Sequence, residues 1–326
     1  MKTQYLLSIL CSSALSIGSL AHAQTPANYP NKPVKMVVGF APGGAADYVA
    51  RNISDAMGKS LGQAIIVENK AGAGSSIAAE FVSKAAPDGY TWVMGFDGTM
   101  VINPHVFAKV GFDPINDYAP IGKIGDATLI LVANPNVPAK NLQELIALSK
   151  KTPGGLSYGT SGTGSTPHIA GELFKIRSGA QLTHVPYKGG GQAMIDVMGG
   201  NIPLVYTAVA GAYNHVKSGK LKPMAVSSPQ RASSLPDVPT FAESGVSDFN
   251  AASWVGFLAP AQTPAAIIQK LNTELNATLN DPVVRDKLRV LGIEATPGSP
   301  ESFRDDIRRD LGRYGPVVKA AGIQVE

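Results

Sequence analysis

Short apolar runs alternate with helical repeats through the first part of the chain. Residues 34–40 (VKMVVGF) are apolar and β-branched and end before a Pro-Gly turn, which predicts a buried strand. Apolar residues then recur every four positions from Val49 to Leu61, and Gly62 supplies a C-cap, which predicts a helix that opens near Asp47. The same alternation places strands at 64–67 and 90–94 and a helix at 74–86. This order predicts a parallel sheet covered by helices.

A second series of the same kind follows. Its strands are expected at 129–133, 156–158, 182–185, 204–206 and 223–226, and its helices at 142–150, 166–174 and 192–198. The two series predict two successive α/β sheets rather than one large sheet.

The C-terminal part is helical after one more strand at 254–258. Helices are expected to begin at Thr263-Pro264, Asp281-Pro282 and Ser299-Pro300. Because these helices are too apolar to stand alone, the chain must return to the first sheet. We therefore expect a discontinuous first domain, residues 24–127 with 251–326, and a second domain, residues 128–250.

Residues 1–23 have the features of a cleaved signal peptide. Lys2 precedes an apolar stretch at 6–20, and Ala21-His22-Ala23 is an A-x-A cleavage site, so the mature chain is expected to begin at Gln24. The stretch is shorter than the roughly 20 residues of a membrane span. Leu10 before Cys11 argues against a lipid anchor. The protein is therefore expected to be exported from the cytoplasm.

The amino-acid composition argues against several classes of function. Cys11 is the only cysteine and lies in the signal peptide, so disulfides, cysteine-based zinc sites and cysteine nucleophiles are excluded from the mature chain. The chain carries 28 Lys and Arg against 24 Asp and Glu, with no basic run. This balance argues against nucleic acid as a partner.

Four glycine- and hydroxyl-rich loops lie where a ligand is expected, at the carboxyl ends of predicted strands. They are residues 40–47 (FAPGGAAD), 95–99 (GFDGT), 158–166 (YGTSGTGST) and 187–192 (YKGGGQ), and residues 72–76 are a candidate for a fifth edge of the site. Glycine exposes backbone N–H groups, and helix starts add positive charge, so an anion such as a small carboxylate is favoured. The candidate ligand-binding residues are Phe40, Pro42, Gly43, Gly44, Asp47, Phe96, Asp97, Thr160, Ser161, Gly162, Thr163, Ser165, Tyr187, Lys188 and Gly189.

Each candidate also has a purely structural interpretation. The glycines can serve as turns and caps, and Asp47 can favour the positive end of a helix. Asp97 can be a turn residue or can accept a hydrogen bond from a ligand amino or hydroxyl group. The aromatic residues Phe40, Phe96 and Tyr187 can line a ligand or belong to the core.

Catalytic motifs are weak. Gly72-Ala73-Gly74 has no third glycine in place, and no GxxxxGK[ST] loop occurs. Thr163 stands where a G-x-S-x-G elbow would need its last glycine. The histidines of the mature chain show no metal-ligand spacing, so no metal or other cofactor is expected. A binding protein is favoured over an enzyme, and a hydrolase that uses Ser161 with a distant histidine stays open.

An ordered set of segments resembles one known family, the Bug (TctC-like) receptors of tripartite tricarboxylate transporters. The segments are 29–33 (YPNKP), 39–44 (GFAPGG), 67–74 (VENKAGAG), 86–90 (APDGY), 102–104 (INP), 117–120 (DYAP), 158–162 (YGTSG), 168–174 (HIAGELF), 185–189 (VPYKG), 235–240 (LPDVPT) and 254–257 (WVGF). Together they span essentially the whole mature chain.

The resemblance implies a two-domain periplasmic binding protein fold of type II, with a mainly parallel sheet in each domain and the ligand cleft between the domains. It implies a small carboxylate ligand (a di- or tricarboxylate, an amino or hydroxy acid, or an aromatic acid), held by backbone N–H groups and hydroxyls. The implied partners are the integral membrane subunits of a tripartite tricarboxylate transporter, and a monomer is expected. A receptor that presents its ligand to a membrane kinase is the alternative. Ala45-Ala46 and Phe96-Asp97 depart from the residues usual in the family, so ligand identity is not carried over.

Overall fold

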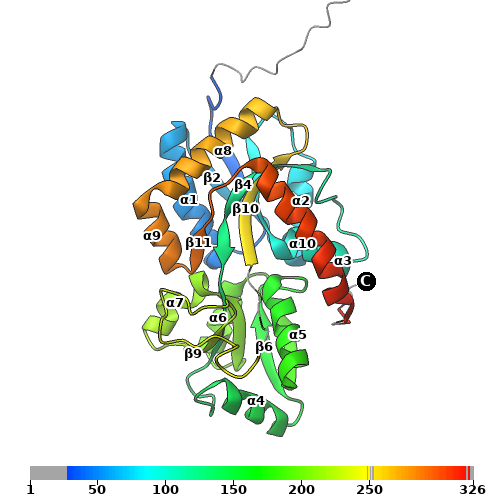
Figure 1. Cartoon of the computed structure of the whole chain (residues 1–326), viewed down its shortest axis with the longest axis vertical. Helices are drawn as coiled ribbons and strands as arrows, with labels where there is room; N and C mark the ends of the chain where they lie inside the picture. Colours follow the sequence, from blue (N-terminus) through cyan, green and yellow to red (C-terminus); the bar gives the residue numbers. More distant parts are fainter. Residues whose placement is uncertain (1–27, 248, 250, 252, 321, 324–326) are drawn as a thin grey trace, which may run out of the picture.

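The computed structural model describes residues 28–247, 249, 251, 253–320 and 322–323. The predicted signal peptide, residues 1–23, and the predicted start at Gln24 lie outside this part of the chain. Two β-sheets with helices packed on them lie one above the other along the long axis of the molecule (Figure 1). We call them, with their helices, the six-stranded half and the five-stranded half.

The six-stranded half combines residues from both ends of the chain. Its strand order is β11-β4-β10-β3-β1-β2. β1 is parallel to both β2 and β3, whereas β10 is antiparallel to β3 and β4, and β11 is antiparallel to β4. The strands are β1 (Val34–Val38), β2 (Ile65–Asn69), β3 (Thr91–Phe96), β4 (Tyr118–Ala127), β10 (Ser253–Pro260) and β11 (Ile293–Ala295).

The five-stranded half is formed by the middle of the chain, in the order β7-β6-β8-β5-β9. β6 is parallel to β7 and β8, and β5 is antiparallel to β8 and β9. The strands are β5 (Leu129–Ala133), β6 (Leu156–Thr160), β7 (Leu182–Pro186), β8 (Leu204–Ala208) and β9 (Lys222–Val226).

The two-domain α/β fold is confirmed, but the sheets are mixed rather than mainly parallel. The predicted strand–helix–strand units supply the parallel pairs. Apart from the pair of β11 with β4, the antiparallel pairs arise because β5 and β10 each enter from the other half. These two strands therefore begin at the junction of the halves, where β3, β6 and β8 end.

Helices cover both faces of the six-stranded sheet, so its inner strands are apolar on both sides. Met36 and Val38 pack toward one helical layer, and Val37 packs toward the other. The first layer holds α1 (Ala45–Leu61), α8 (Ala265–Asn280) and α9 (Pro282–Val290), and the second holds α2 (Ser76–Ser83), α3 (Asn103–Val106) and α10 (Pro300–Ala320). Phe303, Ile307, Tyr314 and Val318 of α10 are buried, and Leu311 is partly buried against them.

The five-stranded sheet is covered in the same way. Ile130 and Val132 of β5 face one helical layer, whereas Leu129 and Leu131 face the other. The helices are α4 (Leu142–Lys151), α5 (Thr166–Ser178), α6 (Gly190–Met198) and α7 (Val209–Lys217). Each half thus has its own main hydrophobic core, and only a few side chains, such as Ala210 of α7 and Ile169 of α5, pack into the core of the other half.

Several elements have no counterpart among the predicted ones. They are β4, β11, α7, α3 and the π-helical turn η2 (Gly98–Ile102). β4 was missed because its sequence, YAPIGKIGDA, contains two glycines and two charged residues. The helix expected at 74–86 is shorter, since the short 3-10 turn η1 (Ala73–Ser75) precedes α2.

The chain passes between the halves twice. One passage is a single residue, Thr128, between β4 and β5, whereas the return runs from β9 to β10. Thr128 is fixed on both sides, because its N–H donates to the carbonyl of Gly292 (2.9 Å) and its carbonyl accepts from the N–H of Val209 (2.9 Å). The proposed boundaries at 127/128 and 250/251 fall at these passages and stay a prediction about which parts move as units.

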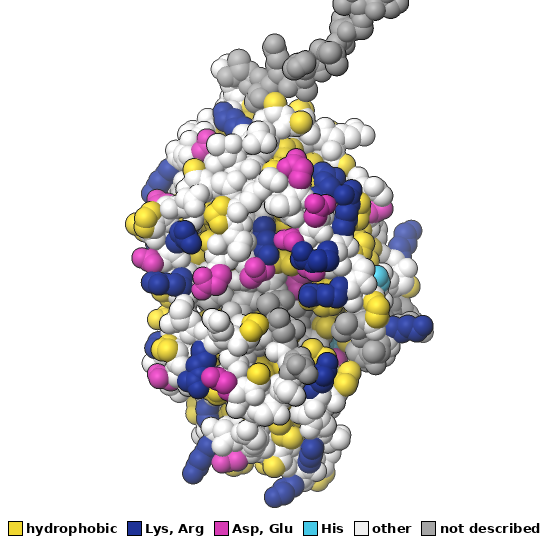
Figure 2. All heavy atoms as spheres, in the orientation of Figure 1, with side chains coloured by type: hydrophobic (Ala, Val, Ile, Leu, Met, Phe, Trp, Pro, Cys, Tyr) yellow, Lys and Arg dark blue, Asp and Glu magenta, His cyan; other side chains and the backbone are white. Residues whose placement is uncertain are grey.

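Charges of both signs are interspersed on the face drawn in Figure 2. This distribution agrees with the small net charge of +4. Across the described helices, none is both long and apolar enough to cross a membrane. The described side chains also include no group of three metal-binding residues.

Candidate ligand-binding site

A cavity of about 80 Å³, here called the first cavity, lies where the two halves meet. Five of the residues predicted from sequence line it: Phe40, Gly44, Phe96, Ser161 and Ser165. The other lining residues are Ala45, Ala46, Gly74, Gly98, Thr99, Ala127, Leu129, Thr166, Pro167, Gly190, Thr207, Ala208 and Ser253. Both halves therefore contribute to the lining of one cavity.

Four helices begin at the first cavity. α1, α5, α6 and α7 have Gly44, Ser165, Gly189 and Ala208 as N-cap residues, and none of these caps makes a side-chain capping hydrogen bond. First-turn N–H groups of these helices thus have no side-chain partner, and the helix dipoles add partial positive charge at the same place. The arrangement suits an anionic group.

The walls of the first cavity are mostly apolar. Phe40 and Phe96 pack edge to face with ring centroids 5.3 Å apart, and Leu129 and Pro167 complete the apolar surface. No residue that lines the cavity carries an ionisable side chain. A bound anion would therefore be held by backbone N–H groups and by a hydroxyl such as that of Ser161, within an apolar enclosure.

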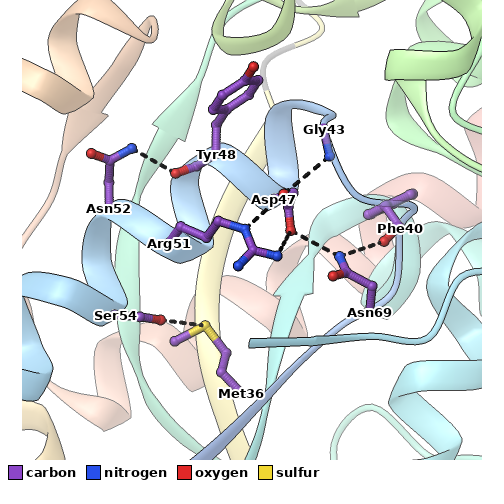
Figure 3. Close-up of polar contacts among 9 residues, drawn as sticks. All are labelled: Met36, Phe40, Gly43, Asp47, Tyr48, Arg51, Asn52, Ser54 and Asn69. Atoms are coloured by element: carbon purple, nitrogen blue, oxygen red, sulfur yellow. Dashed lines mark hydrogen bonds and ion pairs between the residues drawn. The ribbon is translucent and has the colours of Figure 1, made fainter. Parts of the chain in front are cut away.

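Asp47 supports the loop before α1 and does not line the first cavity. Its carboxylate accepts hydrogen bonds from the N–H of Gly43 (3.1 Å), from the guanidinium of Arg51 (3.0 Å) and from the amide of Asn69 (3.1 Å) (Figure 3). Burial alone would raise the pKa of Asp47, but the hydrogen bonds from Arg51, Gly43 and Asn69 outweigh it and lower the pKa. The amide of Asn69 also donates to the carbonyl of Phe40 (3.0 Å), so this network fixes the loop from 40 to 44.

Asp97 joins the two halves and is fully buried. Its Oδ1 accepts a hydrogen bond from Thr166 Oγ1 (2.6 Å), at the start of α5, and another from the hydroxyl of Ser253, at the start of β10. Its Oδ2 has no hydrogen-bond partner among the described residues. Burial raises the pKa of Asp97 to about 6, against the effect of the Ser253 and Thr166 hydrogen bonds. Asp97 does not line the first cavity, although both of its hydroxyl partners do.

Two stacked histidines support the loop from 159 to 166. The rings of His168 and His184 lie 3.8 Å apart. Nε2 of His184 is 2.7 Å from Oγ1 of Thr160, and Nδ1 of His168 accepts from the N–H of Gly164. Burial lowers the pKa of His168 to about 4 and, with repulsion from His168, lowers that of His184 to about 3. The histidines thus hold Thr160 and Gly164 of this loop in place. With pKa values this low, both histidines are neutral at pH 7.

A second cavity, of about 300 Å³, adjoins the first and shares Gly74 and Ser161 with it. Gly162, Thr163, Tyr187 and Lys188, all predicted from sequence, line it. The remaining predicted residues, Pro42, Gly43, Asp47, Asp97, Thr160 and Gly189, line neither cavity. Gly189 instead packs against Ala41, whose N–H donates to the carbonyl of Lys188 (3.3 Å) across the two halves.

Ser161 lacks the surroundings of a hydrolytic nucleophile. In the described part of the chain, no histidine is hydrogen-bonded to its hydroxyl: His184 contacts Thr160, His168 contacts Gly164 and His105 contacts the carbonyl of Leu311. A serine nucleophile needs a general base within hydrogen-bond reach. The geometry therefore gives no support to the hydrolase alternative.

Sequence reasoning missed the residues that the chain passages and α7 bring to the site. Ala127, Leu129 and Ser253 lie at the two passages, for which no local pattern exists. Thr207 and Ala208 end β8 and precede α7. The rule that ligands lie at strand ends would have found them if α7 had been recognised, but its N-cap is an alanine rather than a serine or aspartate.

The fold and sequence match solved binding proteins. The chain is similar to the periplasmic binding protein BugD, with 34% identity over 91% of this chain and 100% of BugD and a TM-score of 0.88. It is equally similar to a Rhodopseudomonas palustris protein solved with adipate: 34% identity over 91% of this chain and 99% of that protein, TM-score 0.88. MatC from Rhodopseudomonas palustris, solved with bound malate, is 31% identical over 89% of this chain and 100% of MatC, with a TM-score of 0.84.

A family model confirms the relationship. Residues 49–323 match the family described as the tripartite tricarboxylate transporter family receptor (TctC). The family and these structural neighbours are solute-binding proteins and not enzymes. The resemblance seen in the sequence is thereby confirmed: the chain belongs to the TctC family of Bug-like solute-binding receptors.

Proposed function

We propose that this protein captures a small carboxylate in the first cavity and delivers it to a tripartite tricarboxylate transporter. One observation carries the proposal: four helices begin at the cavity with N-caps that no side chain satisfies. The carboxylate of the ligand would accept hydrogen bonds from their first-turn N–H groups and from a hydroxyl such as that of Ser161. The adipate and malate held by two relatives are ligands of this chemical class.

The apolar walls would hold the hydrocarbon part of the ligand. Phe40 and Phe96 lie beside the helix starts, so a carboxylate attached to a short carbon chain or ring fits both surfaces. Asp97 would act on the ligand indirectly. Because Thr166 and Ser253 donate their hydroxyl protons to Asp97, their oxygens are left as acceptors toward the cavity. A ligand that carries a hydroxyl or amino group would donate a hydrogen bond to them and so bind more tightly.

Closure of the two halves would couple binding to transport. Residues 24–127 with 251–326 and residues 128–250 would move as two domains about the passage at Thr128. A ligand held by both stabilises the closed form in proportion to its extra affinity for that form. The closed, monomeric protein would then dock on the integral membrane subunits from the periplasm. The A-x-A site at residues 21–23 and the periplasmic relative BugD support this location.

The first experiment compares acids with their neutral analogues. Residues 24–326 are unfolded thermally with adipate and malate and, as controls, with adipamide and malamide, which match them in shape without the charge. A ligand at about 100 times its dissociation constant adds roughly 2.7 kcal/mol to the free energy of unfolding. We expect a dose-dependent shift with one or more acids and none with the amides. Equal shifts with acid and amide, or no shift with any acid in a wider panel of carboxylates, would contradict the anion site.

A further inference from the structure

The end of β3 packs directly on the start of α5, across the junction of the two halves. Gly98 lies so close that a Cβ there would be 2.8 Å from the backbone nitrogen of Thr166, the first residue of α5. In the same way, a Cβ on Gly74 would be 2.7 Å from the carbonyl oxygen of Thr163. The backbones of the two halves are therefore in direct contact at these points.

Asp97 precedes Gly98 in this contact, and its side chain is fully buried. Its Oδ1 accepts a hydrogen bond across the junction from Thr166 Oγ1 (2.6 Å) and another from the hydroxyl of Ser253, which belongs to the same half as Asp97. Its Oδ2 has no hydrogen-bond partner among the described residues. Burial of a charged carboxylate with an unpaired oxygen is costly, whereas burial of the uncharged, protonated group costs much less. The contact therefore favours the protonated form of Asp97.

The charged groups near Asp97 do not reverse this preference. From α10 come Asp310, whose negative charge repels that of Asp97, and Tyr314, whose pKa is raised by burial and then by the charge of Asp97. Arg309 and Arg313 of the same helix pair with Asp310 rather than with Asp97. The start of α5 favours the carboxylate through its partial positive charge. Burial outweighs these effects and raises the pKa of Asp97 to about 6.

Separation of the halves would change the surroundings of Asp97. Thr166 would move away with α5, whereas Ser253 would stay, because β3 and β10 are paired strands of one sheet. Water would replace Thr166 and reach Oδ2, so the carboxyl group would regain a pKa near the ordinary value of 3.8. At a pH between the two pKa values, the closed form binds a proton that the open form releases.

We propose that Asp97 is a proton-binding site that couples closure of the two halves to proton uptake. The proposal rests on the proposed function, because it requires that the halves open and close around a ligand. Since the pKa is higher in the closed form, closure is favoured as the pH falls from about 7 to about 4, and below that both forms are protonated. The receptor therefore holds its ligand more tightly in acid and releases it more readily at neutral pH.

Ligand affinity at two pH values tests the coupling. Adipate and malate are titrated calorimetrically at pH 7 and pH 5 into the wild type and into Asp97→Asn, which cannot ionise but keeps an acceptor oxygen for Thr166. We expect the affinity of the wild type, divided by that of the variant, to rise about tenfold from pH 7 to pH 5. The ratio isolates Asp97, because the titration of the ligand itself is the same for both proteins. Two buffers of different ionisation enthalpy at pH 5 should show that the wild type takes up about one proton more than the variant.

Energy transfer between labels on the two halves measures closure without a ligand. Residues 24–326 contain no cysteine, so Lys84→Cys at the end of α2 and Lys151→Cys at the end of α4 can carry the labels. We expect acidification from pH 7 to pH 5 to raise the closed fraction of the labelled wild type and not of labelled Asp97→Asn. Affinity responds when the open form predominates without ligand, and energy transfer responds when the closed form is well populated, so the two measurements cover both cases.

Two further variants complete the design. Asp305→Asn makes the same chemical change at a side chain of α10 that is 76% exposed, and it should behave as the wild type. Thr166→Val removes the hydroxyl that crosses the junction but keeps the carboxyl group. Because the closed carboxylate then loses a donor, we expect the coupling to remain and its pH range to move upward. Thermal unfolding without ligand checks that each variant is folded.

The outcomes separate the proton site from the proposed function. If Asp97→Asn keeps the pH dependence of the wild type in both measurements, or if Asp305→Asn loses it equally, the proton site is wrong and carboxylate capture is unaffected. If no carboxylate binds at either pH, the proposed function fails, and the energy-transfer titration alone decides whether Asp97 couples closure to the proton.

Discussion

Asp47 and Asp97 are both buried aspartates that adjoin lining residues of the first cavity, yet their pKa values shift in opposite directions. Asp47 contacts a guanidinium, a backbone N–H and an amide, and its pKa is lowered. Asp97 contacts two hydroxyls, and burial raises its pKa to about 6. Burial at a glycine-rich loop therefore does not fix the charge of a carboxyl group. The number and charge of its donors decide it.

Of the substitutions that test this contrast, Asp47→Ala should change the free energy of unfolding most. It leaves the N–H of Gly43 and the amide of Asn69 without their carboxylate acceptor, so we expect the free energy of unfolding to fall by about 3 kcal/mol at pH 7. Because the pKa of Asp47 is lowered on folding, its stabilisation is present above the ordinary pKa of 3.8 and is lost as the pH falls further. Urea unfolding at pH 7 and pH 3 measures both quantities.

The control for Asp47→Ala is Asp55→Ala, which changes an exposed aspartate on the same helix. It should change stability by no more than about 0.5 kcal/mol. Equal effects of the two substitutions would mean that the network around Asp47 is not what stabilises the loop.

Asp97→Asn should raise the free energy of unfolding at neutral pH, whereas Asp47→Ala lowers it. The folded protein keeps the proton of Asp97 up to about pH 6, whereas the unfolded chain loses it near 3.8, so Asp97 makes the wild type less stable as the pH rises between these values. Asparagine cannot ionise. We expect the stability of the variant relative to wild type to rise by about 2 kcal/mol between pH 4 and pH 7.

Urea unfolding across this range checks the prediction for Asp97. The difference between the two proteins isolates Asp97 from His168 and His184, which titrate in part of the same range with the opposite sign because their pKa values are lowered. The neighbouring Asp310, which also raises the pKa of Asp97, is unchanged in the variant. Parallel curves for the two proteins would show that Asp97 is already ionised at pH 4.

Arg51→Gln should have the smallest effect. The side chain of Arg51 is 53% exposed, so its ion pair with Asp47 is screened by solvent. Asp47 also keeps its bonds to Gly43 and Asn69. We expect a loss of about 0.5 kcal/mol by urea unfolding. The control is Arg285→Gln, which changes an exposed arginine on α9. A loss above about 2 kcal/mol for Arg51→Gln would show that the guanidinium is the main stabilising partner of Asp47.

The sequence was sufficient to predict the features of the fold and of the first cavity that depend on residues close together in the chain. Apolar runs and helix caps predicted the strand–helix–strand units, and the loops at their ends contained Phe40, Gly44, Phe96, Ser161 and Ser165 of the first cavity. The family resemblance predicted the fold class as well. These inferences succeed because strand ends, caps and turns are specified within a few residues.

The sequence was insufficient where distant segments meet. Ser253 lines the first cavity because β10 enters the sheet between β3 and β4, and the buried Ser75 lies in a turn before α2 with left-handed backbone angles. Likewise, the donors that set the pKa of Asp97 come from α5 and β10. No local pattern specifies such contacts, since they depend on how the two halves are joined.

The strand order of the six-stranded sheet also constrains how the protein acquires its fold. Among the described strands, β4 pairs only with β10 and β11, and both are made after the whole five-stranded half. A nascent chain that ends before residue 253 therefore has an unpaired β4 and an open edge on β3, both of which favour aggregation. The five-stranded half is contiguous and can fold as soon as it is complete, whereas the six-stranded half must wait for the C-terminus, so a C-terminal truncation would damage the half that is synthesised first.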